Sequence, residues 1–374
     1  MSPSPEFDSA DQQGSRRDFL TGRSLRDHLV RNAREAGEAF LENRPPVPEA
    51  GATLRMATRA MACEFGLVLN PGDRDIVIPA TDALERVHPL EAQMTVYREE
   101  SELSQLNKLA AVAPFVVTEN LYQLLKRGDD LSLRTAGAFD LTAAPYISLW
   151  KKARQENRLP TKEEIAQTGK LVGREHVHYI DETTSIQLAM PGVELNLGGI
   201  GKGYALDVIA AELVEQGIGT FLLHGGQSTM LARGGHNGYP GWPIGLRNPL
   251  FTQQQLATIL IQDCALSTSG SNVQFHRFEG KRYGHIIDPR TGWPVDELLS
   301  VTVLAPTAEE ADALSTAFFV MGVEKTGEFC DNHPEVSAIL ILPPQPGRPI
   351  DPILINVPDD VLYHTPHDLP PADV

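Results

Sequence analysis

A glycine-rich stretch, NLGGIGKG at residues 196–203, constrains the fold of this chain more than any other segment. It lies between a segment beginning at Val193, which we predict to be a strand, and an amphipathic helix that we predict to end at Gly217. A dinucleotide-binding turn requires Gly or Ala at the position of Tyr204, and a phosphate-binding P-loop requires Ser or Thr at the position of Gly203. The stretch therefore matches neither the Rossmann nor the P-loop motif.

The same glycines allow two interpretations. Glycine at a strand-to-helix junction lets backbone N–H groups approach a ligand closely, and the N-terminus of a helix favours negative charge. Lys202 would add a cation to such an anion site. A tight turn that serves only packing would have the same composition, so this segment alone leaves both interpretations open.

Helical periodicity predicts three further helices. Residues 77–94 show it, with Pro89 expected to bend or end the helix, and residues 119–137 show it, with Gly137 as the C′ residue that stops the helix. The last predicted helix covers residues 309–322. Because strands and helices come in runs without regular βαβ alternation, we predict an α+β fold with antiparallel sheet.

Segments rich in β-branched and aromatic residues predict the strands. They are a first strand pair within 53–70, then 220–226, 242–249, 256–270 and 282–289. The Pro-rich part beyond residue 343 should be mostly irregular. Residues 1–50 are polar, so we predict an N-terminal extension, one domain over 51–364 and a disordered tail over 365–374.

The net charge of −17, from 49 acidic and 32 basic residues, argues against nucleic acid or an anionic membrane as a partner. A phosphorylated ligand would therefore need a local basic cluster or a divalent cation. No stretch reaches the apolar length of a membrane span. The three cysteines, Cys63, Cys264 and Cys330, are too widely spaced for a disulfide framework or a zinc site, which fits a reducing compartment.

Arg16 and Arg17 in GSRRDFLTG resemble a twin-arginine export signal. The residues that follow, RSLRDHLVRNAREAGEAF, are charged throughout, whereas an export signal requires an apolar segment there. We therefore predict a cytoplasmic protein, with export by a degenerate twin-arginine signal as the alternative.

Two polar residues on the last predicted helix suggest a metal site. Asp312 and Thr316 are four residues apart and emerge on one helical face, amid neighbours that are nearly all apolar. A carboxylate beside a hydroxyl suits Mg²⁺, which prefers oxygen ligands and takes few from the protein. A solvent-facing polar stripe is the alternative, but polar groups amid so much apolar surface need partners.

The stretch YGHIIDPRTGWPV at residues 283–295 combines an imidazole, a carboxylate and a guanidinium. We predict a strand over 283–287 followed by a tight turn, in which Asp288 would bond its own turn backbone. A polar hairpin explains most of these residues without any catalytic role. ALSTSGS at 265–271 offers hydroxyls at a strand end, and a Ser-rich turn is its simpler interpretation.

Seven segments together resemble the ApbE family, whose members are FAD:protein FMN transferases. They occur in the family's order and spacing over roughly residues 54–345, and they are MTVYREESELSQLN, GAFDLTAAP, ELNLGGIGKGYALD, IGLRNP, STSG, HIIDPRTGWPV and VTVLAPTAEEADALSTAFFVMG. The resemblance implies an α+β architecture related to the T-fold, with a deep cleft that holds FAD.

It also implies an activity and a set of partners. The family's reaction cleaves the FAD pyrophosphate with Mg²⁺ and attaches FMN through its phosphate to a Thr hydroxyl of a target flavoprotein, releasing AMP. Two alternatives retain the same site: an FAD pyrophosphatase that uses water as acceptor, and a divergent flavin-binding protein without transferase activity.

The resemblance assigns roles residue by residue. Those implied along the FAD are Met61, Tyr97, Ala138, Phe139, Asp140, Asn196, Lys202 and Ile286. The implied Mg²⁺ ligands are Gly199, Asp312 and Thr316. His285 would face the pyrophosphate, where a neutral imidazole could accept the proton of the incoming hydroxyl, and Lys202 would stabilise developing charge. Asp288 and Arg290 would fix the end of that strand.

The chain departs from the family pattern at two internal places. Asn196 stands where the family usually has Asp, which removes a charge near the metal or FAD. LLHGGQSTML replaces the usual NLGGD run, so Leu223 and Gln227 occupy the Asn and Asp positions and His224 is additional. These changes favour the divergent alternative, whereas Asp312, Thr316, Lys202 and His285 favour an enzyme.

Overall fold

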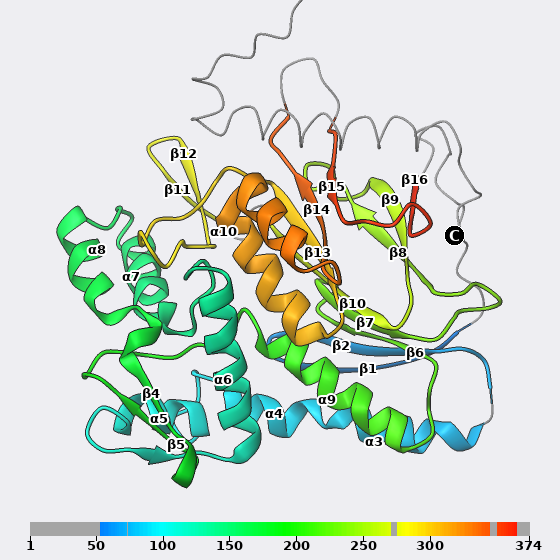
Figure 1. The fold of residues 1–374 in the computed structure, drawn as a ribbon, viewed down its shortest axis with the longest axis horizontal. Coiled ribbons are helices and arrows are strands. Elements are labelled where there is room, and N and C mark those ends of the chain that lie inside the picture. Colours follow the sequence, from blue (N-terminus) through cyan, green and yellow to red (C-terminus); the bar gives the residue numbers. More distant parts are fainter. Residues whose placement is uncertain (1–52, 73, 271–274, 345–349, 365–374) are drawn as a thin grey trace, which may run out of the picture.

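An eight-stranded antiparallel sheet forms the centre of the molecule (Figure 1). The computed structural model describes residues 53–72, 74–270, 275–344 and 350–364. The predicted N-terminal extension with its arginine pair, and the predicted tail, lie outside these residues, so the predictions for them stay predictions. None of the helices described is long and apolar enough to cross a membrane.

Every neighbouring pair of strands in the large sheet is antiparallel, which confirms the predicted fold class. The order across the sheet is β1 (Leu54–Ala60), β2 (Cys63–Leu69), β6 (Phe221–Gly225), β7 (Thr229–Arg233), β10 (Cys264–Gly270), β13 (Ser300–Ala305), β14 (Ser337–Ile341) and β15 (Ile353–Ile355).

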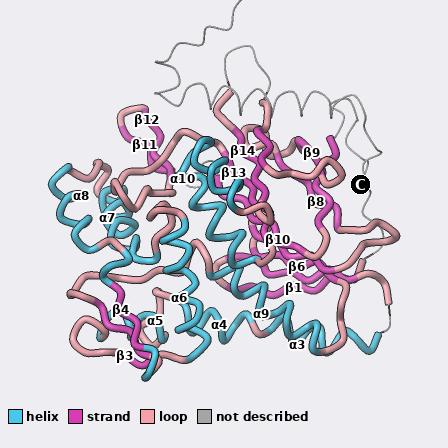
Figure 2. Tube along the Cα trace, viewed as in Figure 1, coloured by secondary structure: helices cyan, strands magenta, loops and turns pink. Residues whose placement is uncertain are grey.

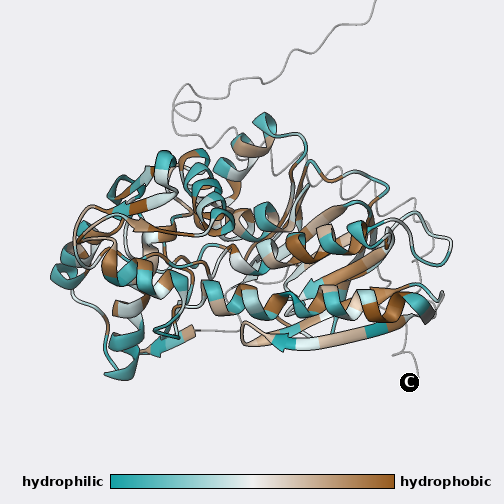
Figure 3. Ribbon diagram, turned by 90° about the horizontal axis from the view of Figure 1, so that it is seen from below, coloured by the Kyte–Doolittle hydropathy of each residue, from teal (hydrophilic) through white to brown (hydrophobic). Residues whose placement is uncertain are grey.

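Helices cover one face of this sheet, and a small sheet covers part of the other (Figures 1 and 2). The helices are α3 (Val77–Glu85), α4 (Val87–Met94), α9 (Gly201–Glu215) and α10 (Ala308–Asn332). The small sheet has the order β16 (Leu362–His364), β9 (Gln255–Ile261) and β8 (Trp242–Arg247). Figure 3 shows the long helices striped in teal and brown, as expected when one face of each packs on a sheet.

A second region contains mostly helices. It comprises α5 (Glu102–Leu109), α6 (Glu119–Arg134), α7 (Ala144–Gln155), α8 (Lys162–Thr168) and a sheet of order β3 (Phe115–Val116), β5 (Ser185–Leu188) and β4 (Val177–Ile180). Five short 3₁₀ helices complete the described helices: η1 (Arg74–Ile76), η2 (Leu141–Ala143), η3 (Gly169–Leu171), η4 (Arg174–His176) and η5 (Asp181–Thr183). A separate hairpin, β11 (Phe275–Phe278) and β12 (Lys281–Gly284), projects beside α7 and α10 (Figure 1).

Several predicted helix boundaries were wrong. The helix predicted for 77–94 divides at Arg86, and Pro89 lies within the first turn of α4, where its missing N–H costs little. After α6, the left-handed C′ residue is Ala136 with φ of 50°, and Gly137 follows it as C″. The last helix continues to Asn332, beyond a break at Gly322 where φ is 74°.

One further predicted helix end was confirmed, and two predictions about strands were wrong. Gly217 ends α9 as predicted, with φ of 81°. The strand predicted from Val193 is absent: residues 193–197 form no regular structure, and the side chain of Asn107, instead of a neighbouring strand, pairs with the backbone of Leu195. The C-terminal part predicted as irregular contains β15 and β16, which add to the edges of two sheets.

Candidate active site

The carboxylate of Asp312 is the centre of a buried polar network. Asp312 is 4% exposed, and its carboxylate accepts hydrogen bonds from Lys202 Nζ at 3.0 and 3.2 Å, and from the Gly203 backbone N–H at 3.2 Å. Thr229 Oγ1 at 3.0 Å and Ser267 Oγ at 3.3 Å donate to the same carboxylate. A buried carboxylate is stable only with such partners, and the ammonium of Lys202 balances its charge.

The register of the large sheet brings the two hydroxyls together. Ser267 of β10 lies directly opposite Thr229 of β7, and their oxygens are 3.2 Å apart. Side chains two residues apart on a strand share a face, so Ser269 also points toward α10. It hydrogen-bonds Ser315 at 2.8 Å and Thr316 at 3.4 Å. Residues 265–270 of the stretch interpreted as a Ser-rich turn therefore belong to strand β10, so for these residues that interpretation was wrong.

The crossing of α9 and α10 holds Lys202 against Asp312. A Cβ at Gly203 would clash with the carbonyl oxygen of Ala308, so glycine is needed for this close approach. The carboxylate of Asp207 on α9 accepts the backbone N–H groups of Ala308 at 2.9 Å and Glu309 at 2.8 Å, at the start of α10. The packing interpretation of the glycine turn is thus correct for Gly203.

Burial raises the pKa of Asp207 to about 7, and its two backbone hydrogen bonds lower it by less. The neighbouring Glu309 is also buried and pairs with Arg127 at 2.7 and 2.8 Å. The start of α10 is therefore fixed from α9 by Asp207 and from α6 by Arg127. This anchoring sets the position of Asp312 one turn later.

Gly199 lies beside the network. A Cβ there would be 3.6 Å from Thr316 Oγ1 and 3.2 Å from Phe139 Cε2. Thr316 Oγ1 also approaches the backbone carbonyl of Asp312 at 3.4 Å. Three predicted metal ligands, Gly199, Asp312 and Thr316, are thus brought to one place, with Phe139 against them.

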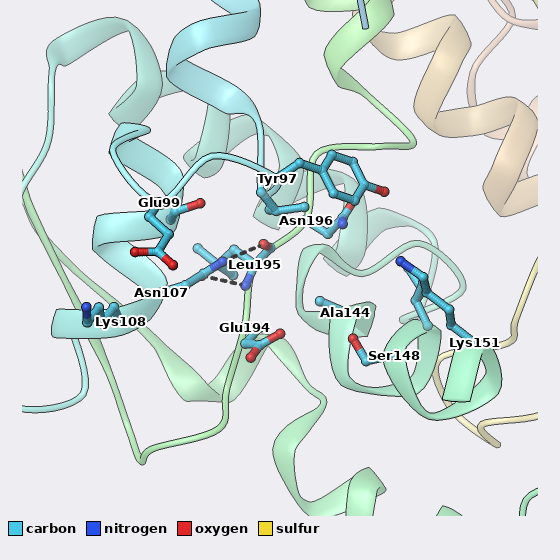
Figure 4. Close-up of a pocket in the computed structure, with 13 residues that line it drawn as sticks. Tyr97, Glu99, Asn107, Lys108, Ala144, Ser148, Lys151, Glu194, Leu195 and Asn196 are labelled. Atoms are coloured by element: carbon cyan, nitrogen blue, oxygen red, sulfur yellow. Dashed lines mark hydrogen bonds between the residues drawn. The ribbon is translucent and has the colours of Figure 1, made fainter. Parts of the chain in front are cut away.

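A pocket of about 570 Å³ adjoins the other end of the glycine stretch (Figure 4). Tyr97 and Asn196 line it together with Ser148 and Lys151 of α7. Tyr97 is 85% exposed, and Lys151 Nζ lies 5.9 Å from the centre of its ring. Along the chain, residues 196–201 connect this pocket to Lys202 of the Asp312 network.

Segment 138–141 lies alongside the glycine stretch. The backbone N–H of Asn196 donates to the carbonyl of Leu141 at 2.8 Å, and Asn196 Oδ1 accepts from Gly198 N at 2.7 Å. Asp140 accepts from Thr142 N and Oγ1 at 2.8 and 2.6 Å, which caps η2, and burial raises its pKa. Asn196 therefore shapes the turn with the same oxygen that Asp would use.

Met61 forms the tip of the β1–β2 hairpin with Ala62. Both residues are left-handed, with φ of 49° and 59°, and Met61 N donates to Glu91 Oε1 at 2.7 Å. Left-handed backbone costs about 1–2 kcal/mol in residues with a Cβ, and such strain is concentrated at functional sites. Cys63, which follows, lies in the field of Lys202 and Asp312, although burial is the main cause that raises its pKa.

The turn after β12 is closed by its own residues. Asp288 is 8% exposed and accepts from Arg290 N, Nε and an Nη at 2.9, 2.8 and 2.9 Å. The predicted strand stops at Gly284, since His285 is exposed and Ile287 forms only an isolated bridge with Pro294. The predicted bonding of Asp288 within its turn is confirmed, and the predicted strand length was wrong.

Two other predicted residues are buried away from solvent. Ala138 is 1% exposed and Ile286 is 7% exposed, and both belong to the main hydrophobic core. His285 precedes Ile286 and stands outside that core. The structure therefore gathers Gly199, Lys202, Asp312 and Thr316, while the placement of His285 at a pyrophosphate stays a prediction.

In β6, β7 and the turn between them, the residues that depart from the family pattern mostly make contacts that stabilise the fold. Leu223 is fully buried, and the His224 ring packs against Gly66 on the opposite face of the sheet, where burial lowers its pKa. Gln227 lies in the β6–β7 turn with φ of 60° and accepts from Arg247 at 2.9 Å. Sequence reasoning missed Thr229, although it lies in the same run.

Comparison with known proteins assigns the chain to a family. The model of the ApbE family matches residues 60–340. An FAD:protein FMN transferase from Salmonella typhimurium is 32% identical over 241 residues, which cover 63% of this chain and 69% of that protein. Another from Treponema pallidum is 33% identical over 279 residues, covering 70% of this chain and 77% of that protein.

Solved structures agree in fold. The flavin transferase ApbE from Vibrio cholerae superposes with a TM-score of 0.70 at 27% identity, over 81% of this chain and 97% of that one. The ApbE protein from Thermotoga maritima gives a TM-score of 0.71 at 27% identity, over 78% and 94% of the two chains. The shared architecture covers most of both chains.

Proposed function

The chain belongs to the ApbE family, and on that premise we propose that it is a Mg²⁺-dependent FAD:protein FMN transferase. The reaction would join FMN through its phosphate to a Thr hydroxyl of a target flavoprotein and release AMP. The observation that carries the proposal is the meeting of Lys202 and Asp312 at the N-terminus of α9, 3.0 Å apart and beside Thr316. The same proposal takes residues 51–364 as the transferase domain.

The donor set fits Mg²⁺. Asp312 would supply a carboxylate, Thr316 a hydroxyl and Gly199 a backbone carbonyl, and all three would be hard oxygen ligands. Among the described residues, no three His, Cys, Asp or Glu side chains cluster as a metal cage. Mg²⁺ commonly binds through one or two carboxylates and completes its shell with substrate phosphates, so a single aspartate is sufficient here. Bound Mg²⁺ would neutralise the pyrophosphate charge.

The chain's own residues would carry out the remaining work. Lys202 and the N-terminus of α9 would stabilise charge that develops on the bridging oxygen of the pyrophosphate. The acceptor Thr oxygen forms a bond to the FMN phosphorus while the bond from that phosphorus to the AMP oxygen breaks. In this scheme His285 takes the proton of the Thr hydroxyl.

The pocket at Tyr97 would hold a ring of FAD. An exposed tyrosine ring at a pocket edge can stack on a planar ligand, and Lys151 over the same ring adds a cation at the edge of this pocket. Phe139, in contact with Gly199, would separate this ring pocket from the metal oxygens. FAD would then extend along residues 196–202, with its pyrophosphate at Lys202.

Incubation with FAD and Mg²⁺, with and without a flavoprotein domain that contains a candidate acceptor Thr, tests the proposal. The expected result is a mass increase of the acceptor by one FMN phosphoester, with one AMP released per adduct. AMP and FMN without an adduct would identify an FAD pyrophosphatase. Tight FAD binding with neither product would identify a flavin-binding protein and overturn the proposal.

A further inference from the structure

The β11–β12 hairpin carries positive charge on a strongly acidic protein. Between Phe275 and Gly284 it has three cations, Arg277, Lys281 and Arg282, and one anion, Glu279, whereas the whole chain has a net charge of −17. All three cations are exposed. A segment of this sign on such a chain provides a local surface for negative groups.

The two faces of the hairpin differ. On the inner face, Tyr283 packs on Trp150 with ring centres 5.7 Å apart, and Lys281 lies 3.8 Å from Asp296. On the other face, Arg277 pairs directly with Arg282 across the ladder. Since successive side chains alternate between faces, this arginine pair points away from the face that rests on α7.

The arginine pair has the form of a recognition element. Both guanidinium groups lie over the ring of Phe275, at 5.4 and 4.0 Å from its centre, which keeps them extended side by side. Two adjacent guanidinium groups suit carboxylates in particular, because each can bond a carboxylate through two N–H groups.

The hairpin rests on α7, whose Ser148 and Lys151 line the Tyr97 pocket, and in the sequence it lies between β10 and His285. Five residues before Phe275, strand β10 ends at Gly270, next to the Ser269 that bonds Ser315 and Thr316. On the other side, β12 ends at Gly284, and His285 follows directly. A protein bound at the arginine pair would therefore lie close to α7 and to the segment that carries His285.

We propose that the Arg277–Arg282 face of the β11–β12 hairpin docks an acidic segment of the acceptor flavoprotein, close to its acceptor Thr. The inference rests on the proposed transferase function and adds the chemistry by which the acceptor is recognised. The hairpin contributes to acceptor binding and not to FAD binding.

The test uses two Thr-containing peptides of equal length, one with Asp residues on both sides of the Thr and one with Asn in their place. Wild type is compared with Arg277→Glu/Arg282→Glu, the milder Arg277→Gln/Arg282→Gln, and a matched control, Arg55→Glu/Arg233→Glu. The control removes two exposed arginines from β1 and β7 with the same change in charge. Peptide affinity is measured by fluorescence anisotropy with FAD bound, FAD affinity by titration, and transfer by adduct mass.

Wild type and the control should bind the acidic peptide better than the neutral one, and the Glu variant should lose about tenfold in affinity for the acidic peptide. The Gln variant should lose less, the differences should shrink at high salt, and FAD affinity should stay within twofold. Equal loss in the control, an unchanged Glu variant, or weakened FAD binding would each overturn the docking surface. Because binding is measured without turnover, a wild type that binds but never transfers refutes the transferase function alone.

Discussion

Two buried aspartates, Asp288 and Asp312, are satisfied in opposite ways. Asp288 takes its three hydrogen bonds from Arg290, two residues further along the chain. Asp312 takes its bonds from α9, β7 and β10, and Lys202 is 110 residues away in the sequence. One carboxylate completes a turn, and the other joins three separate elements.

This difference distinguishes a carboxylate that stabilises the fold from one that can take part in catalysis. A turn that binds its own arginine has a fixed geometry and little capacity for a ligand. A carboxylate shared by a cation and two hydroxyls from independent elements can exchange partners when a metal and a pyrophosphate bind. The comparison therefore predicts catalytic effects for changes at Asp312 and effects on stability for changes at Asp288.

The largest effect is expected at Asp312. Asp312→Ala should lower Mg²⁺-dependent AMP release by at least about 10³-fold, because the metal loses its charged ligand and Lys202 its counter-ion. Single-turnover AMP release at saturating FAD measures this loss. Calorimetric titration of Mg²⁺ into the FAD complex provides the check, and an unchanged Mg²⁺ affinity in the variant would remove Asp312 from the metal site.

The next largest effect on transfer is expected at His285. If its imidazole takes the proton of the acceptor Thr hydroxyl, His285→Ala should reduce transfer by about 10²–10⁴-fold and leave FAD affinity within a few-fold. The wild-type rate should fall at acid pH, since a protonated imidazole cannot accept a proton, and the variant should lack that fall. A variant that transfers at the wild-type rate once saturated would show that His285 is not catalytic.

Arg290→Ala should act on stability and spare the chemistry. It removes the two side-chain donors of a buried carboxylate, which should lower the free energy of unfolding by about 1–3 kcal/mol. Arg174→Ala is the matched control, because its pair with Asp129 also uses two donors but its side chain is 43% exposed, so about 1 kcal/mol or less is expected. Urea unfolding compares the two. Equal losses would contradict the assignment of Asp288 to the turn structure.

A pH-dependent effect on stability is expected at Asp207. The pKa of Asp207 is about 7 in the folded protein and 3.8 in an unfolded chain. The folded protein therefore binds the proton of this carboxyl group more tightly. Its contribution to stability is therefore complete below about pH 4 and is lost as pH rises through 7. Relative to Asp207→Asn, wild-type stability should fall by up to ~1.4 kcal/mol per pH unit in that window. Unfolding curves at several pH values test this, and a difference that is independent of pH would contradict it.

Local features were predictable from the sequence, because their partners lie within a few residues. The Asp288 turn, the C′ glycine at residue 217 and the β1–β2 pair needed no long-range information. The spacing of Asp312 and Thr316 was also sufficient to place both on one helical face. The family resemblance added the correct fold class and named the three predicted metal ligands that the structure brings together.

The remaining features of the fold and the site could not be predicted from the sequence. Strands β15 and β16 are short, and they became strands only because an edge was available for pairing. Ala136 adopts a left-handed conformation that its side chain disfavours, because the Schellman geometry at the end of α6 requires it. Thr229 and Ser267 belong to one network only through the register of β7 against β10.

The sequence by itself therefore determined that this chain carries Lys202, Asp312 and a glycine turn in the pattern of the ApbE family. Tertiary structure alone decided that Lys202 lies 3.0 Å from Asp312 and that Gly203 lets α9 and α10 meet. The physical reason is range. Backbone preferences act between neighbours in the chain, whereas hydrogen bonds and ion pairs in the site act over about 3 Å of space and depend on where separate elements pack.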